Sequence, residues 1–315
     1  MVKIAFWDNC LCERGTAIAI YDYALFNRTI LGNESIILYN PNNKHNNSDV
    51  VDKFKKEFAV HEISNNSELD PLLEAERCDI VYIIKAGDNS DGRISKIKKS
   101  VIHCVFTCNF PHGDVYASVS PRVEGNNGNY PVVPHIVHLP IHEQNLREKL
   151  NIPKNAVVFG RHGGYETFSI DYVKRVVSSV AKCFPDIYFL FVNTEPFCDP
   201  LPNVIHLNKI IDLNSKSEFI NTCDAMLWAR SDGETFGLSI AEFSILNKPV
   251  LATHSGDNAH VYYLGDKGIW YNESNLYDIL TQFKKEDYEK KDWNAYREYS
   301  PEKVMAIFKR VFIDN

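Results

Sequence analysis

The stretch AMLWARSDGETFGLSIAEFSILNKPVLA, residues 225–252, holds a strand, a loop, a helix and a second strand in quick succession. The apolar runs AMLWA and PVLA have the character of strands that are buried on both faces, as in a parallel sheet. Between them, the polar loop SDGETFG leads into LSIAEFSIL, whose apolar residues follow a helical spacing. We therefore predict a strand–helix–strand unit, the building block of a doubly wound α/β domain.

The same alternation of apolar runs and helical patterns extends along the chain, for example in KIAFWD, SIILYN and DIVYIIKAG before residue 115 and in VVFGRHGG and IYFLFVNT after residue 156. The intervening segment 115–140 is rich in Pro, Gly and Asn, which is typical of a domain edge. We expect an α/β protein with two Rossmann-like domains, 1–145 and 146–300, that face each other across a cleft. Residues 301–315 predict a final helix that can pack back on the first domain.

Composition excludes several classes of protein. The 315 residues carry a formal net charge of −7, which does not support binding to nucleic acid. No apolar run approaches the roughly 18 residues of a spanning helix, and the N-terminus lacks the layout of a signal peptide. The eight cysteines have no paired CxxC spacing, so we expect a reduced, cytoplasmic protein without a metal site.

Two carboxylates, Glu234 and Glu242, bracket the start of the predicted helix, which we place near Phe236. The first N–H groups of a helix lack helical acceptors and suit a diphosphate. Glu234 can accept hydrogen bonds from hydroxyls beside that phosphate. Glu242, roughly two turns into the helix, can bind vicinal hydroxyls such as those of a ribose. Together these groups describe a site for a sugar nucleotide, in which the backbone contacts come from Thr235, Phe236, Gly237 and Leu238.

This pattern resembles the retaining glycosyltransferases of the two-Rossmann-domain (GT-B) architecture, in particular the large family 4 group. The E-x7-E signature of that family matches Glu234 and Glu242, with FGL and NKPVLA in the expected places. The resemblance covers the second domain well and the first only in outline. It implies that Glu234 contacts the donor sugar and Glu242 the ribose. The alternative is a loop acid and a solvent-facing helical glutamate.

Two arginines are candidates for the diphosphate. VVFGRHGG, residues 157–164, is similar to the strand-then-GR segment that opens the family's second domain, so the resemblance implies that Arg161 binds the diphosphate. The family usually has a lysine a few residues later, and HGGYETF offers none. Arg230 can supply the missing charge as a fork to phosphate. The alternatives are a solvated loop arginine at 161 and an interdomain salt bridge at 230.

The first domain also holds candidate residues for the site. The family places a glycine-containing loop after the first strand, which matches Gly15, with Arg14 beside it and Thr16 as a helix cap. The resemblance also implies a histidine close to the donor sugar, for which we choose His112, expected in a cleft-facing loop. Asp114 can orient it or contact the acceptor. The alternatives are a plain turn before a helix at Gly15 and a turn histidine followed by an Asx-type turn at 112–114.

Four further features have competing interpretations. His103 falls inside a strand and is expected to be a core residue. Lys85 can face the acceptor, although a solvated strand-end lysine is the simpler alternative. The segment SKIKK, 95–99, can contact an anionic membrane peripherally, but we favour a solvated helical face. His260 stands in a loop where the family commonly has an acid, and can tune the choice of donor or be an ordinary loop residue.

The resemblance predicts a glycosyltransferase that moves a sugar from a nucleoside-diphosphate sugar to an unknown acceptor, with retention of anomeric configuration. The acceptor would be a glycan, a lipid-linked sugar or a small molecule. We predict His112, Glu234 and Arg161 as catalytic residues, with no metal ion and no cofactor beyond the donor. The alternatives are a sugar-nucleotide epimerase or a glycogen-phosphorylase-like enzyme of the same architecture, and a non-catalytic scaffold that binds sugar nucleotides.

Overall fold

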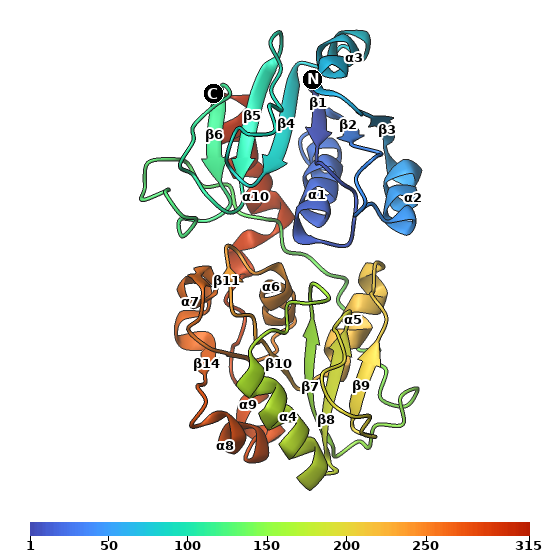
Figure 1. Ribbon diagram of the computed structural model, residues 1–315, viewed down its shortest axis with the longest axis vertical. Coiled ribbons are helices and arrows are strands. Elements are labelled where there is room, and N and C mark those ends of the chain that lie inside the picture. The colour runs from blue at the N-terminus through green and yellow to red at the C-terminus, as the bar shows by residue number, and fades with distance from the viewer. The chain divides into compact units, whose positions relative to one another are not determined.

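The computed structural model describes residues 1–315, which divide into two compact units (Figure 1). The first unit comprises Met1–Ile136 and Glu298–Asn315, and the second comprises Val137–Arg297. The boundary lies after Ile136, earlier than the predicted residue 145, because the residues between these two positions bind to the second unit. Ser217 Oγ donates to the carbonyl of Pro140 at 2.8 Å, and Asn221 Nδ2 donates to the carbonyl of His142 at 2.6 Å.

The first unit is built on a sheet of six parallel strands in the order β3-β2-β1-β4-β5-β6. Apolar side chains fill both faces, as expected for parallel strands covered on each side by other elements. The strands are β1 (Lys3–Trp7), β2 (Glu34–Tyr39), β3 (Ala59–Glu62), β4 (Ile80–Lys85), β5 (Lys99–Cys104) and β6 (Val115–Ser118).

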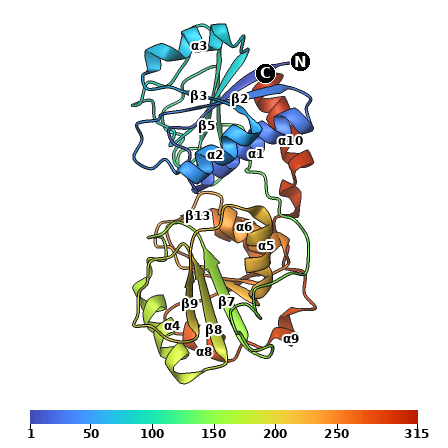
Figure 2. The ribbon, with the colours of Figure 1, turned by 90° about the vertical axis from the view of Figure 1, so that its right-hand side faces the viewer.

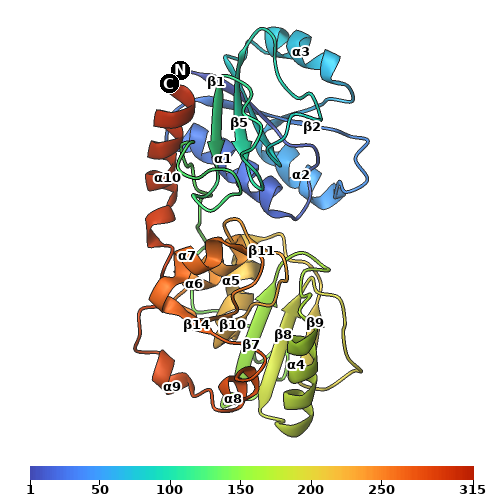
Figure 3. The same cartoon turned by 60° about the vertical axis from the view of Figure 1, so that its left-hand side comes forward.

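Four helices cover this sheet: α1 (Gly15–Thr29), α2 (Ser48–Glu57), α3 (Leu69–Ala75) and α10 (Pro301–Phe308), which continues as a wider helical turn to Ile313. The helix α10 lies beside α1, although about 270 residues separate them in the chain (Figure 3). Its Phe308 is fully buried, with ring centroids 5.2 Å from Tyr23 and 5.6 Å from Tyr82. The C-terminal segment therefore completes the core of the first unit.

The second unit contains a parallel sheet in the order β14-β12-β10-β7-β8-β9 and a two-stranded ladder of β11 and β13. The six strands of the sheet are β7 (Val157–His162), β8 (Ile187–Val192), β9 (Val204–Leu207), β10 (Ala225–Leu227), β12 (Val250–Ala252) and β14 (Gly268–Trp270). The ladder joins β11 (Gly233–Glu234) to β13 (Asp257–Asn258).

Helices pack on both faces of this sheet (Figure 2). They are α4 (Asp171–Cys183), α5 (Leu213–Thr222), α6 (Leu238–Ile245), α7 (Ala259–Leu264), α8 (Leu276–Thr281) and α9 (Lys285–Tyr288). The helices α4 and α8 share one apolar core with Phe159 of β7. The next residue, Gly160, points to the opposite face, where a Cβ atom would lie only 2.1 Å from Cys223 Sγ at the end of α5. The absence of a side chain at 160 thus lets α5 pack directly on β7.

In both units the strands follow the order 3-2-1-4-5-6, which defines the Rossmann fold. This confirms the α/β class and the two Rossmann-like domains predicted from the sequence, whereas the cleft between them stays a prediction. In each sheet the order reverses between two neighbouring strands: β1 and β4 in the first unit, β7 and β10 in the second. No helix in the chain is both long enough and apolar enough to cross a bilayer.

Candidate functional site

The carboxyl ends of β7 and β10 are where most of the predicted site residues of the second unit meet. These strands pair through Ala225 with Phe159 and through Met226 with Gly160. Strand β7 ends in Arg161 and His162, and β10 is followed by Arg230 in a loop and by Glu234 in β11. Ligands of doubly wound sheets bind at such a reversal of strand order.

The start of α6 lies in this loop region and begins at Leu238, two residues later than predicted. The reason is Gly237, which adopts a left-handed conformation (φ +85°) and forms the N-cap without any side-chain cap. The first-turn N–H groups have no acceptor within the helix, and such groups suit an anion. Phe236 stays outside the helix because its buried ring packs 5.1 Å from Tyr263 and 5.6 Å from Tyr296, measured between centroids.

Glu234 lies in β11 beside this helix start, and its side chain is 15% exposed. Trp228 Nε1 donates to one carboxylate oxygen at 2.9 Å, and Arg230 Nη1 donates to the other at 3.4 Å. Burial raises the pKa of Glu234, although Arg230 and the indole of Trp228 oppose this effect. The structure thus brings Arg230 and Glu234 together, and both ion-pair partners of Arg230, Glu234 and Asp232, belong to its own unit.

Arg161 is buried, so the alternative of a solvated loop arginine is wrong. Its guanidinium donates to Thr194 and Thr167 and to the carbonyl of Gly164 at 3.0 Å. Burial lowers the pKa of Arg161 to about 10, and nearby Glu234 counteracts part of this shift. These contacts bind the loop after β7 to the end of β8, and a direct contact of Arg161 with a diphosphate stays a prediction.

Glu242 is only 4% exposed, so the alternative of a solvent-facing helical glutamate is also wrong. One carboxylate oxygen accepts a hydrogen bond from Lys216 Nζ of α5 at 2.7 Å, and the other lies 3.0 Å from His162 Nε2 of β7. Burial would raise the pKa of Glu242, but the charges of Lys216 and His162 outweigh it and hold the pKa at about 2. Sequence reasoning missed both partners. His162 follows Arg161 directly, and this position could have marked it, whereas nothing in the sequence marks Lys216.

His260 is the second residue of α7, so the expectation that it stands in a loop is wrong, and this helix start lies against Trp228. The imidazole of His260 packs with its centroid 4.2 Å from that of Trp228, and its Nε2 lies 2.9 Å from the carbonyl oxygen of Thr253. His260 is fully buried, and burial lowers its pKa. It therefore supports the ring that binds Glu234, and its effect on the choice of donor stays a prediction.

In the first unit, Gly15 is the first residue of α1 and Arg14 is its N-cap, without a side-chain cap. The expectation that Thr16 caps this helix is wrong, because Thr16 lies in the first turn, where it is a hydrogen-bond partner of Asp8. Asp8 follows β1, is 3% exposed, and its pKa is raised to about 6 by burial, against the charge of Arg93. The helix start and Asp8 thus lie together at the strand-order reversal of this sheet.

His112 lies elsewhere in the first unit. Two residues separate it from the start of β6, its Nδ1 is 2.6 Å from the carbonyl oxygen of Phe110, and its ring packs on Tyr116 of β6. Asp114 accepts a hydrogen bond from the backbone N–H of Ser100, which lies near the beginning of β5. The loop after β5 crosses from the carboxyl end of β5 to the amino end of β6, and His112 lies at that amino end. A catalytic role for His112 stays a prediction.

The other candidates of the first unit also have definite places. His103 is fully buried in β5, which confirms the prediction that it is a core residue. Lys85 is buried and paired with Asp91, so a solvated strand-end lysine is wrong. Residues 95–98 are not helical and lead directly into β5, which contradicts the predicted helical face.

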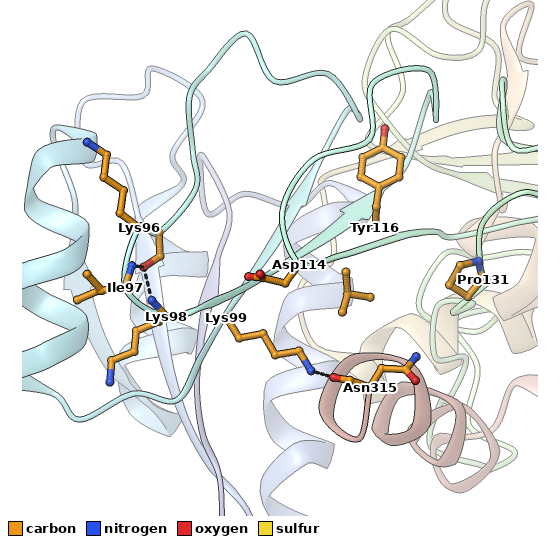
Figure 4. Close-up of a pocket in the computed structure, with 10 residues that line it drawn as sticks. Lys96, Ile97, Lys98, Lys99, Asp114, Tyr116, Pro131 and Asn315 are labelled. Atoms are coloured by element: carbon orange, nitrogen blue, oxygen red, sulfur yellow. Dashed lines mark hydrogen bonds between the residues drawn. The ribbon is translucent and has the colours of Figure 1, made fainter.

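Lys96, Lys98 and Lys99 line an open cavity of about 800 Å³ with Asp114 and Tyr116 (Figure 4). Lys99 donates to the carbonyl oxygens of Ile313, at 3.3 Å, and Asn315. This cavity lies at the amino ends of β5 and β6, on the edge where ligands of doubly wound sheets do not bind. Peripheral contact of this basic segment with a membrane stays a prediction.

No cluster of three or more His, Cys, Asp or Glu side chains in the structure has the arrangement of a metal site. The sulfur atoms of Cys10 and Cys12 lie 3.7 Å apart and have no third ligand beside them.

No protein-family model and no curated protein matches this chain. Solved structures do match over nearly their whole length. A glycosyltransferase from Rickettsia africae is 14% identical, with a TM-score of 0.72, and the match covers 100% of this chain and 99% of that one. Anabaena HepE, solved with UDP-glucose, is 16% identical, with a TM-score of 0.67 and coverage of 99% and 96%. A Listeria monocytogenes protein described as a UDP-N-acetylglucosamine 2-epimerase is 14% identical, with a TM-score of 0.62 and coverage of 100% and 97%. At these identities the comparison establishes the two-Rossmann-domain fold.

Proposed function

We propose that this protein is a glycosyltransferase that transfers a sugar from a nucleoside-diphosphate sugar, with retention of anomeric configuration. The observation that carries the proposal is the grouping of an uncapped helix start, a carboxylate and an arginine at the carboxyl ends of β7 and β10. The helix start and Arg230 suit the two phosphates, and the carboxylates of Glu234 and Glu242 suit the hydroxyls on either side of them. A uridine nucleotide is the first donor to test, because structurally similar HepE was solved with UDP-glucose.

In the proposed reaction, the bond between the anomeric carbon and the β-phosphate oxygen breaks, and the acceptor hydroxyl attacks the same face of the sugar. The departing phosphate takes the proton of that hydroxyl, so no separate general base is required. Arg230 and the first turn of α6 stabilise the charge that develops on the leaving diphosphate. Electrostatic stabilisation of this kind usually contributes more to catalysis than any other effect. Because these groups supply the charge, we propose that no metal ion is needed.

The remaining residues have supporting roles in this proposal. Glu234 accepts hydrogen bonds from the hydroxyls of the donor sugar and is oriented by Trp228 and Arg230. Arg161 holds the loop after β7 in place and adds positive potential near the diphosphate. Gly15, at the start of α1, and His112 are proposed contacts from the first unit. The acceptor class is left to experiment, among a glycan, a lipid-linked sugar and a small molecule.

An epimerase is the second candidate, since the Listeria protein shares the fold over the full length of both chains. The two reactions differ in what happens to the donor. A transferase releases nucleoside diphosphate, whereas an epimerase that inverts the C2 centre can return an isomer of the intact sugar nucleotide.

The test is to incubate the purified protein with UDP-glucose and UDP-N-acetylglucosamine and to follow UDP and the sugar anomer by NMR. Transfer to an added acceptor, or slow hydrolysis to the α-anomer of the free sugar, supports the proposal. The rate should not change when EDTA is added in excess. Loss of activity that Mg²⁺ restores would refute metal independence. A C2-epimeric sugar nucleotide would establish the second candidate instead. Binding without turnover would indicate a non-catalytic protein.

A further inference from the structure

The carboxylate of Glu242 is held by two residues that neither the sequence pattern nor the proposed function assigns. Lys216 of α5 and His162 of β7 each contact a different oxygen of it, at 2.7 Å and 3.0 Å. The side chains of Lys216 and Glu242 are 7% and 6% exposed, and that of His162 is 12% exposed. We call these three residues the Glu242 cluster.

Two aromatic rings pack against the histidine of the cluster. The imidazole of His162 stacks on Phe243, with centroids 5.7 Å apart and an interplanar angle of 18°, and meets Phe219 edge-on at 6.0 Å. A carboxylate removed from water in this way is costly unless it is paired. Its pairing partners come from two different elements, so its position is fixed relative to both β7 and α5.

The location of the cluster beside the proposed phosphate site indicates a role in ligand binding as well as in packing. Glu242 is the fifth residue of α6, whose first turn is the proposed phosphate site. An ionised carboxylate can accept about four hydrogen bonds. Lys216 contacts one of its oxygens and His162 contacts the other. Both oxygens therefore retain acceptor capacity for a pair of neighbouring hydroxyls, as in the 2′,3′-diol of a ribose.

We propose that Lys216 and His162 are positioning residues that hold Glu242 as an oriented, ionised acceptor for the ribose diol, and so select ribonucleotide over 2′-deoxyribonucleotide donors. The inference rests on the proposed function, since it requires that a nucleotide binds at this site. Without the charge of Lys216, the buried carboxyl would tend to hold a proton and lose acceptor capacity. Without either neighbour, the carboxylate would be free to rotate away from the diol.

The experiment compares the Kd of UDP, GDP and ADP with that of each 2′-deoxy counterpart by titration calorimetry, for the wild type and for Lys216→Met. The wild type should prefer the ribonucleotide by about tenfold or more, as expected for a hydrogen bond to a charged group. Lys216→Met should reduce this preference to about threefold or less, by weakening the ribonucleotide and leaving the deoxynucleotide nearly unchanged. Lys182→Met, which removes an exposed lysine of α4, is the matched control and should leave the preference intact.

Two further variants separate a positioning role from a structural one. His162→Gln should also lower the preference for the ribonucleotide over the deoxynucleotide. This variant provides the comparison with the wild type if Lys216→Met does not fold. In a Glu242→Gln background the preference should already be lost, so that adding Lys216→Met has no further effect on it. Equal weakening of both nucleotides by Lys216→Met and His162→Gln, or no weakening, would overturn the inference while leaving the proposed function standing. Failure of the wild type to bind any of the six nucleotides would overturn the proposed function, and the inference with it.

Discussion

Glu234 and Glu242 have the same side chain, but their surroundings move their pKa values in opposite directions. Burial dominates at Glu234, where the partners are the neutral indole of Trp228 and the partly exposed Arg230, and the pKa is raised. At Glu242, Lys216 and His162 outweigh burial, and the pKa falls to about 2. The two carboxylates are thus suited to the different tasks proposed for them, Glu234 beside the donor sugar and Glu242 as an ionised acceptor.

Glu234→Gln tests the first task. We expect sugar transfer to fall by about a hundredfold or more, because an amide replaces the carboxylate beside the sugar and disturbs the Arg230 contact. The melting temperature should change little, since the side chain packs in no apolar core. Steady-state kinetics and thermal unfolding measure the two effects, with Glu286→Gln, an exposed glutamate of α9, as the control. Loss of stability with unchanged activity per folded molecule would contradict the assignment.

The depressed pKa of Glu242 predicts how stability depends on pH. Its folded pKa of about 2 lies below the usual value of 4.5. The folded state therefore gains stability from this group above about pH 4.5, and loses it as the pH falls from there towards 2. Urea unfolding between pH 3 and pH 7 should show that the wild type exceeds Glu242→Gln in stability at pH 7, by a margin that shrinks towards pH 3. A margin independent of pH would show that the carboxylate is not held in its ionised form.

At the scale of elements, Gly160 allows α5 to pack closely on the sheet of the second unit. Gly160→Ala would place a Cβ atom 2.1 Å from Cys223 Sγ and 3.0 Å from Cys223 Cβ. We expect a loss of about 1–3 kcal/mol in the free energy of unfolding, which is typical of an overpacked core. The double variant Gly160→Ala/Cys223→Ala should recover part of that loss in a urea titration. A single variant as stable as the wild type would mean that α5 does not pack on β7 as closely as described.

Most elements can be predicted from the sequence because their signals are local. The buried strands are apolar runs, and the β–loop–α–β unit at 225–252 needs only neighbouring residues to be recognised. The start of α6 lies two residues later than the pattern predicts, because the left-handed Gly237 and the buried ring of Phe236 end the loop through contacts with distant residues. The basic segment at 95–99 has the composition of a helical face, yet Lys99 begins β5.

The parts of the candidate site that sequence reasoning missed depend on long-range contacts. His162, Lys216 and Glu242 are 54 and 26 residues apart in sequence, and only the strand order of the sheet brings them together. Arg161 stands in a recognisable motif, but the motif does not reveal its burial against Thr167 and Thr194. The position of His112 at the amino end of β6 could not be predicted, because the length of a loop does not reveal that it crosses from one sheet edge to the other.

At the scale of the whole molecule, the chain returns at its C-terminal end to the unit in which it began. Residues 298–315 belong to the first unit, and Phe308 fills an aromatic cluster with Phe6, Tyr23 and Tyr82. The core of the first unit is therefore complete only when the C-terminal segment, which follows the whole second unit in sequence, packs on it.

Phe308→Ala tests how much α10 contributes to the first unit. Phe308 is fully buried, and removing a buried phenylalanine side chain typically costs about 3–5 kcal/mol. Denaturant unfolding monitored by intrinsic fluorescence should show a loss of this size. Phe110→Ala, which removes a ring that is 58% exposed in the same unit, should change stability by less than about 1 kcal/mol. Similar effects of the two variants would show that α10 is only loosely attached.

The central claim is that the second unit binds a nucleoside-diphosphate sugar at the carboxyl ends of β7 and β10. The most direct test is a thermal-shift screen of the purified protein against UDP-, GDP-, ADP-, CDP- and dTDP-sugars, repeated with Arg230→Ala. We predict that one nucleotide class raises the melting temperature, since a ligand at about 100 times its Kd stabilises the folded state by roughly 2.7 kcal/mol. Arg230→Ala should reduce or abolish the shift. A flat screen for the wild type, with and without Mg²⁺, would contradict the claim.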